Sequence, residues 1–186
     1  MTEKYFNKLS TYLILLIVVF VLCQLLWEHL NGGVVSHYLL HRSDLPAISN
    51  WWGIVILPAL AWFATRRIKK RIAFRNDDVS DGGRIPAGIL TGFFVMLIVS
   101  LLQSVAFVSG YENITMMMAL ILLLASLFLP IYRAECVLGF VLGAAFTFGA
   151  VIPLIGILVI ATISAVANLC IGPLLVNLWR RFKRTT

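Results

Sequence analysis

Residues 136–179 read CVLGFVLGAAFTFGAVIPLIGILVIATISAVANLCIGPLLVNLW and contain no charged side chain. A helix that crosses the hydrocarbon core of a bilayer needs about 20 predominantly apolar residues. This run is therefore too long for one span and long enough for two. Gly149, Pro153 and Gly156 favour a tight turn, so we place the break between the two glycines. The stretch predicts two consecutive transmembrane helices, over about 136–151 and 154–179.

The rest of the chain has the same character. Of its 186 residues, 61% are hydrophobic and 12% are charged, whereas a soluble domain is about 25% charged. Backbone groups in lipid must be satisfied internally, which leaves helices or a closed barrel, and the apolar runs lack the two-residue alternation of barrel strands. We therefore predict an all-α, polytopic integral membrane bundle that forms a single domain over residues 1–186. Four further spans are expected, at about 11–27, 48–64, 85–108 and 114–131, which makes six transmembrane helices.

The positions of the basic residues orient this bundle. If the N-terminus lies inside, fourteen of the fifteen Lys and Arg residues fall on inner segments, and Arg42 is the exception. These inner segments are 1–10, 65–84, 132–135 and 180–186. Lys and Arg in short loops stay on the cytoplasmic side of a membrane. We therefore expect cytoplasmic N- and C-termini, a basic inner loop over 65–84, and a loop over 28–47 on the outer face of the plasma (inner) membrane.

The net charge of +7 raises the question of a nucleic-acid partner. The basic run from Arg66 to Arg75 reads RRIKKRIAFR. Nucleic-acid binding would need a folded reader domain, for which the chain has no room, so no nucleic acid is expected. Each positive charge near an anionic membrane surface contributes about 1 kcal/mol. The run therefore indicates contact with anionic lipids.

Small residues recur at a spacing of four in two of the expected spans. Gly88 and Gly92 form one such pair, and Gly139 and Gly143 form another. Residues at this spacing let two membrane helices approach closely. We expect them to pack helices within the chain, and they are also compatible with a homo-oligomer or a membrane-protein partner.

The outer loop 28–47 holds all three histidines of the chain, His29, His37 and His41. On a helix, His37 and His41 would share a face, and Asp44 would fall on the same side. Two imidazoles and a carboxylate can hold Zn²⁺ and leave a fourth position open for water, which can then act as a nucleophile. The spacing therefore indicates a metal site with Zn²⁺ as the candidate cofactor.

The same loop also has plainer interpretations. An amphipathic helix over 34–42 would lie on the membrane surface without binding anything. Trp51 and Trp52 are typical of an interfacial aromatic belt, and Ser49 or Asn50 would cap the helix that follows. These alternatives remain open from the sequence alone.

Several polar side chains inside the expected spans lie near the outer side of the membrane, where the loop 28–47 is expected. Gln24 lies in the outer half of the first span, and Gln103 and Ser104 lie in the outer half of the third. We expect them to form a polar pocket that opens outward beneath residues 28–49. The loop would add Glu28, His29 and Ser36 to this pocket. The plainer alternative is a set of interhelical hydrogen bonds, worth about 0.6 kcal/mol each.

Three functions follow as hypotheses. The first is a membrane protein whose outward-facing pocket binds or conducts a small polar ligand, a lipid or an ion. The second is a metal-dependent enzyme at the outer leaflet that uses His37, His41 and Asp44, and the third is an accessory subunit of a membrane complex. No acid lies in the middle of a span, which disfavours carboxylate-based proton coupling. The sequence assigns no catalytic residue.

Overall fold

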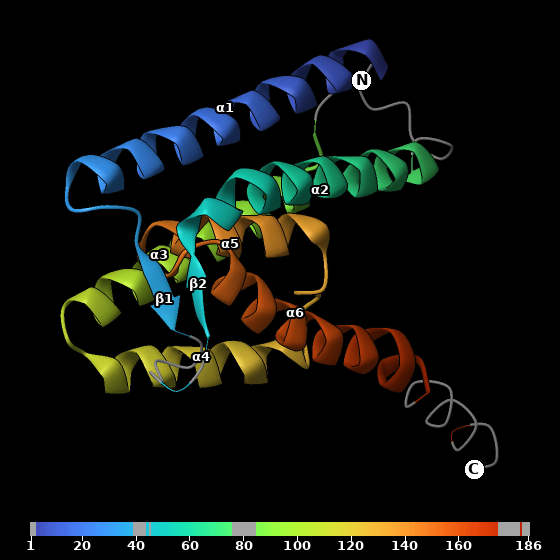
Figure 1. Ribbon diagram of the computed structural model, residues 1–186. Helices are drawn as coiled ribbons and strands as arrows, with labels where there is room; N and C mark the ends of the chain where they lie inside the picture. Colours follow the sequence, from blue (N-terminus) through green and yellow to red (C-terminus); the bar gives the residue numbers. More distant parts are fainter. Residues whose placement is uncertain (1–2, 39–43, 45, 76–84, 175–182, 184–186) are drawn as a thin grey trace.

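The computed structural model describes residues 3–38, 44, 46–75, 85–174 and 183, and this part of the chain is mostly helical (Figure 1). Helix α1 (Glu3–Leu30) leads into a hairpin of strands β1 (Ser36–Tyr38) and β2 (Ala47–Ser49). A short 3₁₀ turn, η2 (Asn50–Trp52), then starts α2 (Gly53–Arg75). The remaining elements are α3 (Ala87–Val108), α4 (Glu112–Ser126), α5 (Ala134–Phe148), α6 (Val151–Ala165) and a π-helical segment η3 (Val166–Ile171). The predicted helical class is confirmed, and the hairpin is an addition to it.

Three helices in the described part of the chain are long and apolar enough to cross a membrane. They cover Phe6–Leu30, Ala87–Val108 and Val151–Leu174. Helices α4 and α5 are apolar but have only 15 residues each, about 22 Å at 1.5 Å per residue. These lengths support a membrane-embedded protein.

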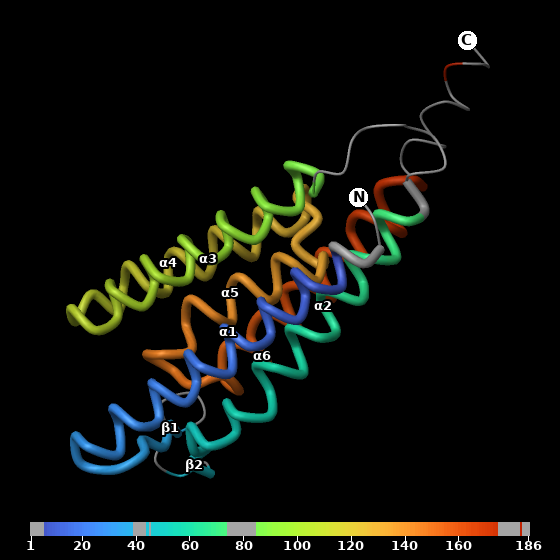
Figure 2. The backbone as a smooth tube through the Cα atoms, turned by 90° about the horizontal axis from the view of Figure 1, so that it is seen from above, coloured from blue at the N-terminus to red at the C-terminus, as the bar shows by residue number. Residues whose placement is uncertain are grey.

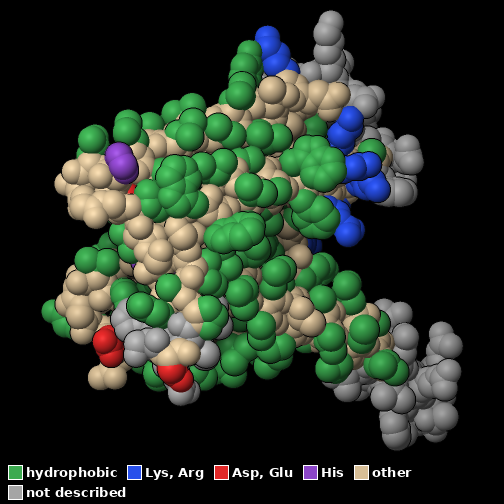
Figure 3. All heavy atoms as spheres, in the orientation of Figure 1, with side chains coloured by type: hydrophobic (Ala, Val, Ile, Leu, Met, Phe, Trp, Pro, Cys, Tyr) green, Lys and Arg blue, Asp and Glu red, His purple; other side chains and the backbone are tan. Residues whose placement is uncertain are grey.

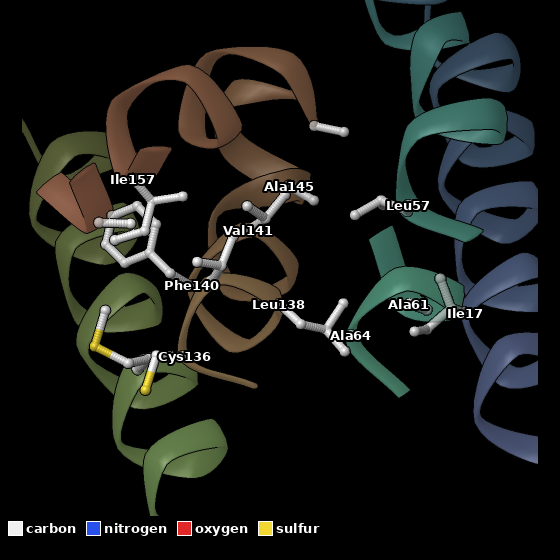
Figure 4. Close-up of a cluster of buried hydrophobic side chains, with 14 of the residues drawn as sticks. Ile17, Leu57, Ala61, Ala64, Cys136, Leu138, Phe140, Val141, Ala145 and Ile157 are labelled. Carbon is white, nitrogen blue, oxygen red and sulfur yellow. The ribbon is translucent and has the colours of Figure 1, made fainter. Parts of the chain in front are cut away.

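Helix α5 is the centre of the bundle. Helices α1 and α2 run along one side of it, and α3 and α4 form an antiparallel pair on another (Figure 2). Ten of the fifteen residues of α5 are buried. Its Leu138 and Val141 belong to the same apolar core as Ile17 of α1 and Leu57 and Ala61 of α2 (Figure 4). Because its neighbours cover it, α5 does not need to match the full thickness of the lipid.

The close contact between α5 and α3 depends on two glycines of α5, which have no side chain. A Cβ atom on Gly139 would overlap the carbonyl oxygen of Phe93, and one on Gly143 would overlap the hydroxyl of Ser100. The close approach predicted from the spacing of these glycines is therefore confirmed. Gly88 of the other predicted pair has no heavy atom within 4 Å of its would-be Cβ.

Helix α2 continues through the basic run. Its last residue is Arg75, so residues 66–75 are helical, and the loop predicted over 65–84 is wrong for these residues. Lys and Arg are good helix formers, and two of them bind aromatic rings one turn earlier: Arg66 lies over Trp62 and Arg67 over Phe63. The rest of the expected loop, 76–84, lies outside the described residues.

The predicted helix in the outer loop is wrong at residues 36–38, which form strand β1. Gly32 and Gly33 adopt φ of 115° and 106°, a backbone that ends α1 and that other residues rarely adopt. The strands pair antiparallel, with Ser36 opposite Ser49 and His37 opposite Ile48. The pairing satisfies backbone N–H and C=O groups that a single extended segment would leave without hydrogen bonds. The expected cap is present, because Trp51 N donates to Ser49 Oγ.

The predicted break in the long C-terminal run is confirmed at Gly149. This residue has φ of 69° and separates α5 from α6. Pro153 follows in the first turn of α6, where its missing N–H leaves no helical hydrogen bond unmade.

The α3–α5 contact yields a stability prediction. Gly143→Ala should lower the melting temperature of the detergent-solubilised protein, because the added methyl overlaps backbone and side-chain atoms of α3; overpacking of this kind costs about 1–3 kcal/mol. Gly156→Ala is the matched control, since its Cβ would meet nothing within 4 Å and alanine is the better helix former. Thermal unfolding of both variants checks the expectation, and equal melting temperatures would contradict it.

Candidate functional site

The two ends of the bundle differ in charge. Lys and Arg side chains gather at the end where α2 finishes, and Asp, Glu and His side chains are seen at the opposite end (Figure 3). We call the first the basic end, and it carries Arg66, Arg67, Lys69, Lys70, Arg71 and Arg133. We call the second the hairpin end, because β1 and β2 lie there. Each end holds one candidate site.

At the hairpin end, the site is built around Glu28. This residue lies in the last turn of α1 and is only 4% exposed. Its Oε1 accepts hydrogen bonds from Gln24 Nε2 at 3.0 Å and Asn50 Nδ2 at 2.7 Å, and its Oε2 accepts one from Val35 N at 3.0 Å. Gln24 Nε2 also donates to the carbonyl of Ala145 at 3.1 Å. A buried carboxylate requires such donors, and these tie α1, the hairpin, η2 and α5 together.

Two further residues lie against this cluster. A Cβ atom on Gly149 would overlap Asn50 Oδ1 and would lie 3.5 Å from His37 Cδ2. Gly149 therefore allows the carboxamide and the imidazole to approach the turn between α5 and α6. The buried cluster thus consists of Gln24, Glu28 and Asn50, with His37 at its edge.

The structure brings together only some of the residues predicted for the outer pocket. Gln24 and Glu28 share a hydrogen bond, but His29 and Ser36 are exposed. Gln103 Nε2 donates to the carbonyl of Thr115 on α4 at 3.4 Å, and the neighbouring Ser104 is buried on α3. Gln24 and Gln103 therefore contact different helices, α5 and α4. An outward-facing pocket stays a prediction.

The predicted metal site lies partly beyond the described residues. His37 is on strand β1 and Asp44 is exposed, while His41 lies outside the described part of the chain. Because residues 36–38 are extended, the shared helix face that motivated the site is absent at His37. Among the described residues, no group of three His, Cys, Asp or Glu side chains is placed to hold a metal ion. The Zn²⁺ site stays a prediction.

At the basic end, a groove of about 770 Å³ lies between α2, α5 and α6. Its walls are largely aliphatic and aromatic, and four cationic residues line it. These are Arg67, Lys70, Arg71 and Arg133. A binding site of this size falls within the range of small-molecule pockets, about 300–1,000 Å³.

One of these cations is paired with a buried acid. Arg71 Nη2 donates to Glu135 Oε1 at 2.5 Å, and Glu135 is only 2% exposed. An arginine can compensate a buried carboxylate because its guanidinium remains charged and donates along fixed directions. The pair joins the basic half of α2 to the first turn of α5.

Sequence reasoning missed three residues that matter here. For Asn50 the sequence predicts only a capping role, and for Arg133 and Glu135 only a place in the short inner segment 132–135. The only signal in the sequence was an acid directly before a long apolar run, on the same expected side of the membrane as the basic segment 66–75. Charge pairing across 64 residues has no spacing rule that a single sequence could reveal.

Comparison with protein families, curated proteins and solved structures finds no match in any of the three.

The Glu28 cluster gives a second stability prediction. Glu28→Ala should lower the melting temperature strongly, because it leaves Asn50 Nδ2 and Val35 N without their acceptor and Gln24 Nε2 with only the carbonyl of Ala145; each buried donor left unsatisfied costs about 1–3 kcal/mol. His29→Ala, a change at the exposed neighbour, should alter the free energy of unfolding by no more than about 0.5 kcal/mol. Thermal unfolding in detergent measures both, and a Glu28→Ala protein as stable as the parent would refute the structural role.

Proposed function

We propose that this chain is an integral membrane protein that binds anionic lipid at its basic end. One observation carries the proposal: the groove between α2, α5 and α6 combines an apolar wall with four cationic side chains. A phospholipid has the matching chemistry, since its acyl chains are apolar and its phosphate is anionic. Contact with anionic lipids at Arg66–Arg75 was expected from the sequence, and lipid was also one of the ligand classes expected for the outward-facing pocket on the opposite face.

The charge balance of the groove supports an anionic ligand. Glu135 offsets one cation, Arg71. Arg67, Lys70 and Arg133 then leave an excess of positive charge along the same groove. Arginine matches phosphate geometry with two parallel hydrogen bonds, and lysine acts as a compact point charge. The three side chains together suit a phosphate headgroup.

The apolar wall supports a lipid over a free anion. Leu60, Val137, Leu158 and Ala161 line the groove from three helices. Free phosphate would gain nothing from this surface, whereas an acyl chain would gain about 25 cal/mol for each Å² of apolar area removed from water. Where the groove opens to surrounding lipid, the gain comes from packing instead.

The proposed topology places this groove at the inner leaflet. We propose six membrane crossings with both termini in the cytoplasm, because the basic residues gather at one end of the bundle and such residues stay on the cytoplasmic side. The first turn of α1, the end of α2 and the start of α5 would then face the cytoplasm. Anionic lipids of the inner leaflet would meet the groove directly.

Reporter fusions test the proposed topology. Green fluorescent protein fused after residue 186 should fluoresce, and alkaline phosphatase at the same position should be inactive, because the C-terminus is expected in the cytoplasm. Alkaline phosphatase inserted after Asp44, in the loop expected outside, should be active. Phosphatase activity at the C-terminal position would contradict the cytoplasmic C-terminus, and together with an active insertion after Asp44 it would contradict an even number of crossings.

Lipid binding can be tested with a charge-matched pair of variants. The double variant Lys70→Gln, Arg133→Gln should bind phosphatidylglycerol roughly 30-fold more weakly, because each cation near a lipid phosphate contributes about 1 kcal/mol and each 1.4 kcal/mol is tenfold in affinity. Arg66→Gln, Lys69→Gln removes the same charge from residues that line a different cavity, between α1 and α2. It should retain most of the affinity. Native mass spectrometry with phosphatidylglycerol and phosphatidylcholine measures both.

The proposal fails if phosphatidylcholine binds as tightly as phosphatidylglycerol to the parent protein. It also fails if the two double variants lose affinity equally, because the loss would then report net charge and not this groove.

A further inference from the structure

Arg133 lies where the groove proposed above for anionic lipid meets a second cavity. This cavity has a volume of about 700 Å³ and lies between α3, α4 and α5. In the first turn of α5, Val137 lines the groove and Cys136 lines the cavity, so the helix separates the two spaces. Arg133, half-buried directly before this turn, lines both of them.

The second cavity is long and largely apolar. On α3 its lining begins at Gly88, in the first turn, and ends at Val99, about 16 Å further along at 1.5 Å per residue. A Cβ atom on Gly88 would meet no heavy atom within 4 Å, so the space is open beside the start of the helix. Glu135 also lines this cavity, and Arg71 balances its charge. An elongated apolar space that begins beside a cation suits the acyl chain of an anionic lipid.

The cations of the groove exceed the charge of a single phosphate. Arg67, Lys70 and Arg133 remain once the pair of Arg71 and Glu135 is set aside, whereas phosphatidylglycerol carries one negative charge. These cations also belong to two elements, because Arg67 and Lys70 are on α2 and Arg133 precedes α5. Two phosphates match the number and the placement of these charges better than one.

Resting on the lipid binding proposed above, we propose that the preferred ligand of the basic end is a phospholipid with two phosphates and two pairs of acyl chains, of the diphosphatidylglycerol type. One of its phosphatidyl groups occupies the groove beside Arg67 and Lys70. The other places its phosphate beside Arg133 and an acyl chain in the cavity between α3, α4 and α5. Basic pockets between membrane helices on the cytoplasmic side are typical sites for such headgroups.

The covalent bridge favours this ligand over two separate lipids. Linking two binding groups makes the second binding event intramolecular, with a high effective concentration. Once one phosphatidyl group lies in the groove, the glycerol bridge holds the other close to Arg133, which lines both spaces. Two phosphatidylglycerol molecules would each lose translational and rotational freedom on binding.

Native mass spectrometry of the full chain tests the proposal with diphosphatidylglycerol and phosphatidylglycerol, both carrying oleoyl chains. We expect one diphosphatidylglycerol per chain, bound roughly tenfold more tightly than phosphatidylglycerol, because the second phosphate meets cations that the first leaves unmatched. If phosphatidylglycerol binds and diphosphatidylglycerol binds no more tightly, this inference is overturned and the lipid groove stands. If neither lipid binds, the groove itself is refuted.

Two neighbouring positions on α4 supply a matched pair of variants. Ile121 lines the cavity, Leu120 is outside the lining that the structure describes, and both are more than half exposed. Ile121→Trp should weaken diphosphatidylglycerol binding roughly fivefold, equivalent to about 1 kcal/mol, and leave phosphatidylglycerol binding unchanged. Leu120→Trp should change neither affinity. Gly88→Leu fills the same cavity from α3 and should reproduce the effect of Ile121→Trp.

Two results in these variants would overturn the location. Unchanged diphosphatidylglycerol binding in both Ile121→Trp and Gly88→Leu would show that the cavity is not used. Equal losses for the two lipids would show that the cavity holds an acyl chain of either one and does not select the second phosphatidyl group.

Discussion

The close approach of α5 to α3 is the constraint on which the rest of the structure depends. Gly139 and Gly143 have no Cβ atoms, so the backbone of α5 lies against that of α3 and the helix can occupy the centre of the bundle. Both candidate sites use this central position. Near its first turn α5 presents Glu135 to Arg71 of α2, and near its last turn it presents the carbonyl of Ala145 to Gln24 of α1. A helix displaced outward by one methyl group would disturb both ends.

The two ends solve the problem of buried polar groups in opposite ways. At the hairpin end, three donors from different parts of the chain satisfy the carboxylate of Glu28. This carboxylate therefore serves to hold the fold together. At the basic end, positive charge exceeds the nearby negative charge along the groove, and one carboxylate oxygen has no donor among the described residues. Groups that the fold already satisfies have little left to offer a ligand, whereas cationic side chains in excess along an apolar groove can bind an anion. This contrast moves the best-supported site from the histidine-rich loop to the opposite end of the bundle.

Hydropathy and turn residues predicted the helices well because burial in lipid or core leaves long unbroken apolar runs. The break at Gly149 and the contact at Gly143 followed from the properties of glycine itself. The hairpin could not be predicted, because a strand of three residues has no periodicity, and the spacing of His37 and His41 indicated a helix where residues 36–38 form a strand. The pairing of Arg71 with Glu135 was equally hidden, since it depends on how α2 and α5 pack. Properties that depend on neighbouring residues could be predicted from the sequence, whereas contacts between residues far apart in the chain could not.

The Arg71–Glu135 pair decides which cations of the groove are free for the proposed lipid. Arg71 lines the groove between α2, α5 and α6, and its partner Glu135 is buried on α5. A phosphate that took the guanidinium of Arg71 would leave Glu135 without its partner, and a buried carboxylate that loses its partner is strongly destabilised. Arg67, Lys70 and Arg133 carry no such cost, so the proposed phosphate site consists of these three side chains, while Arg71 stays on Glu135 and holds α2 against α5.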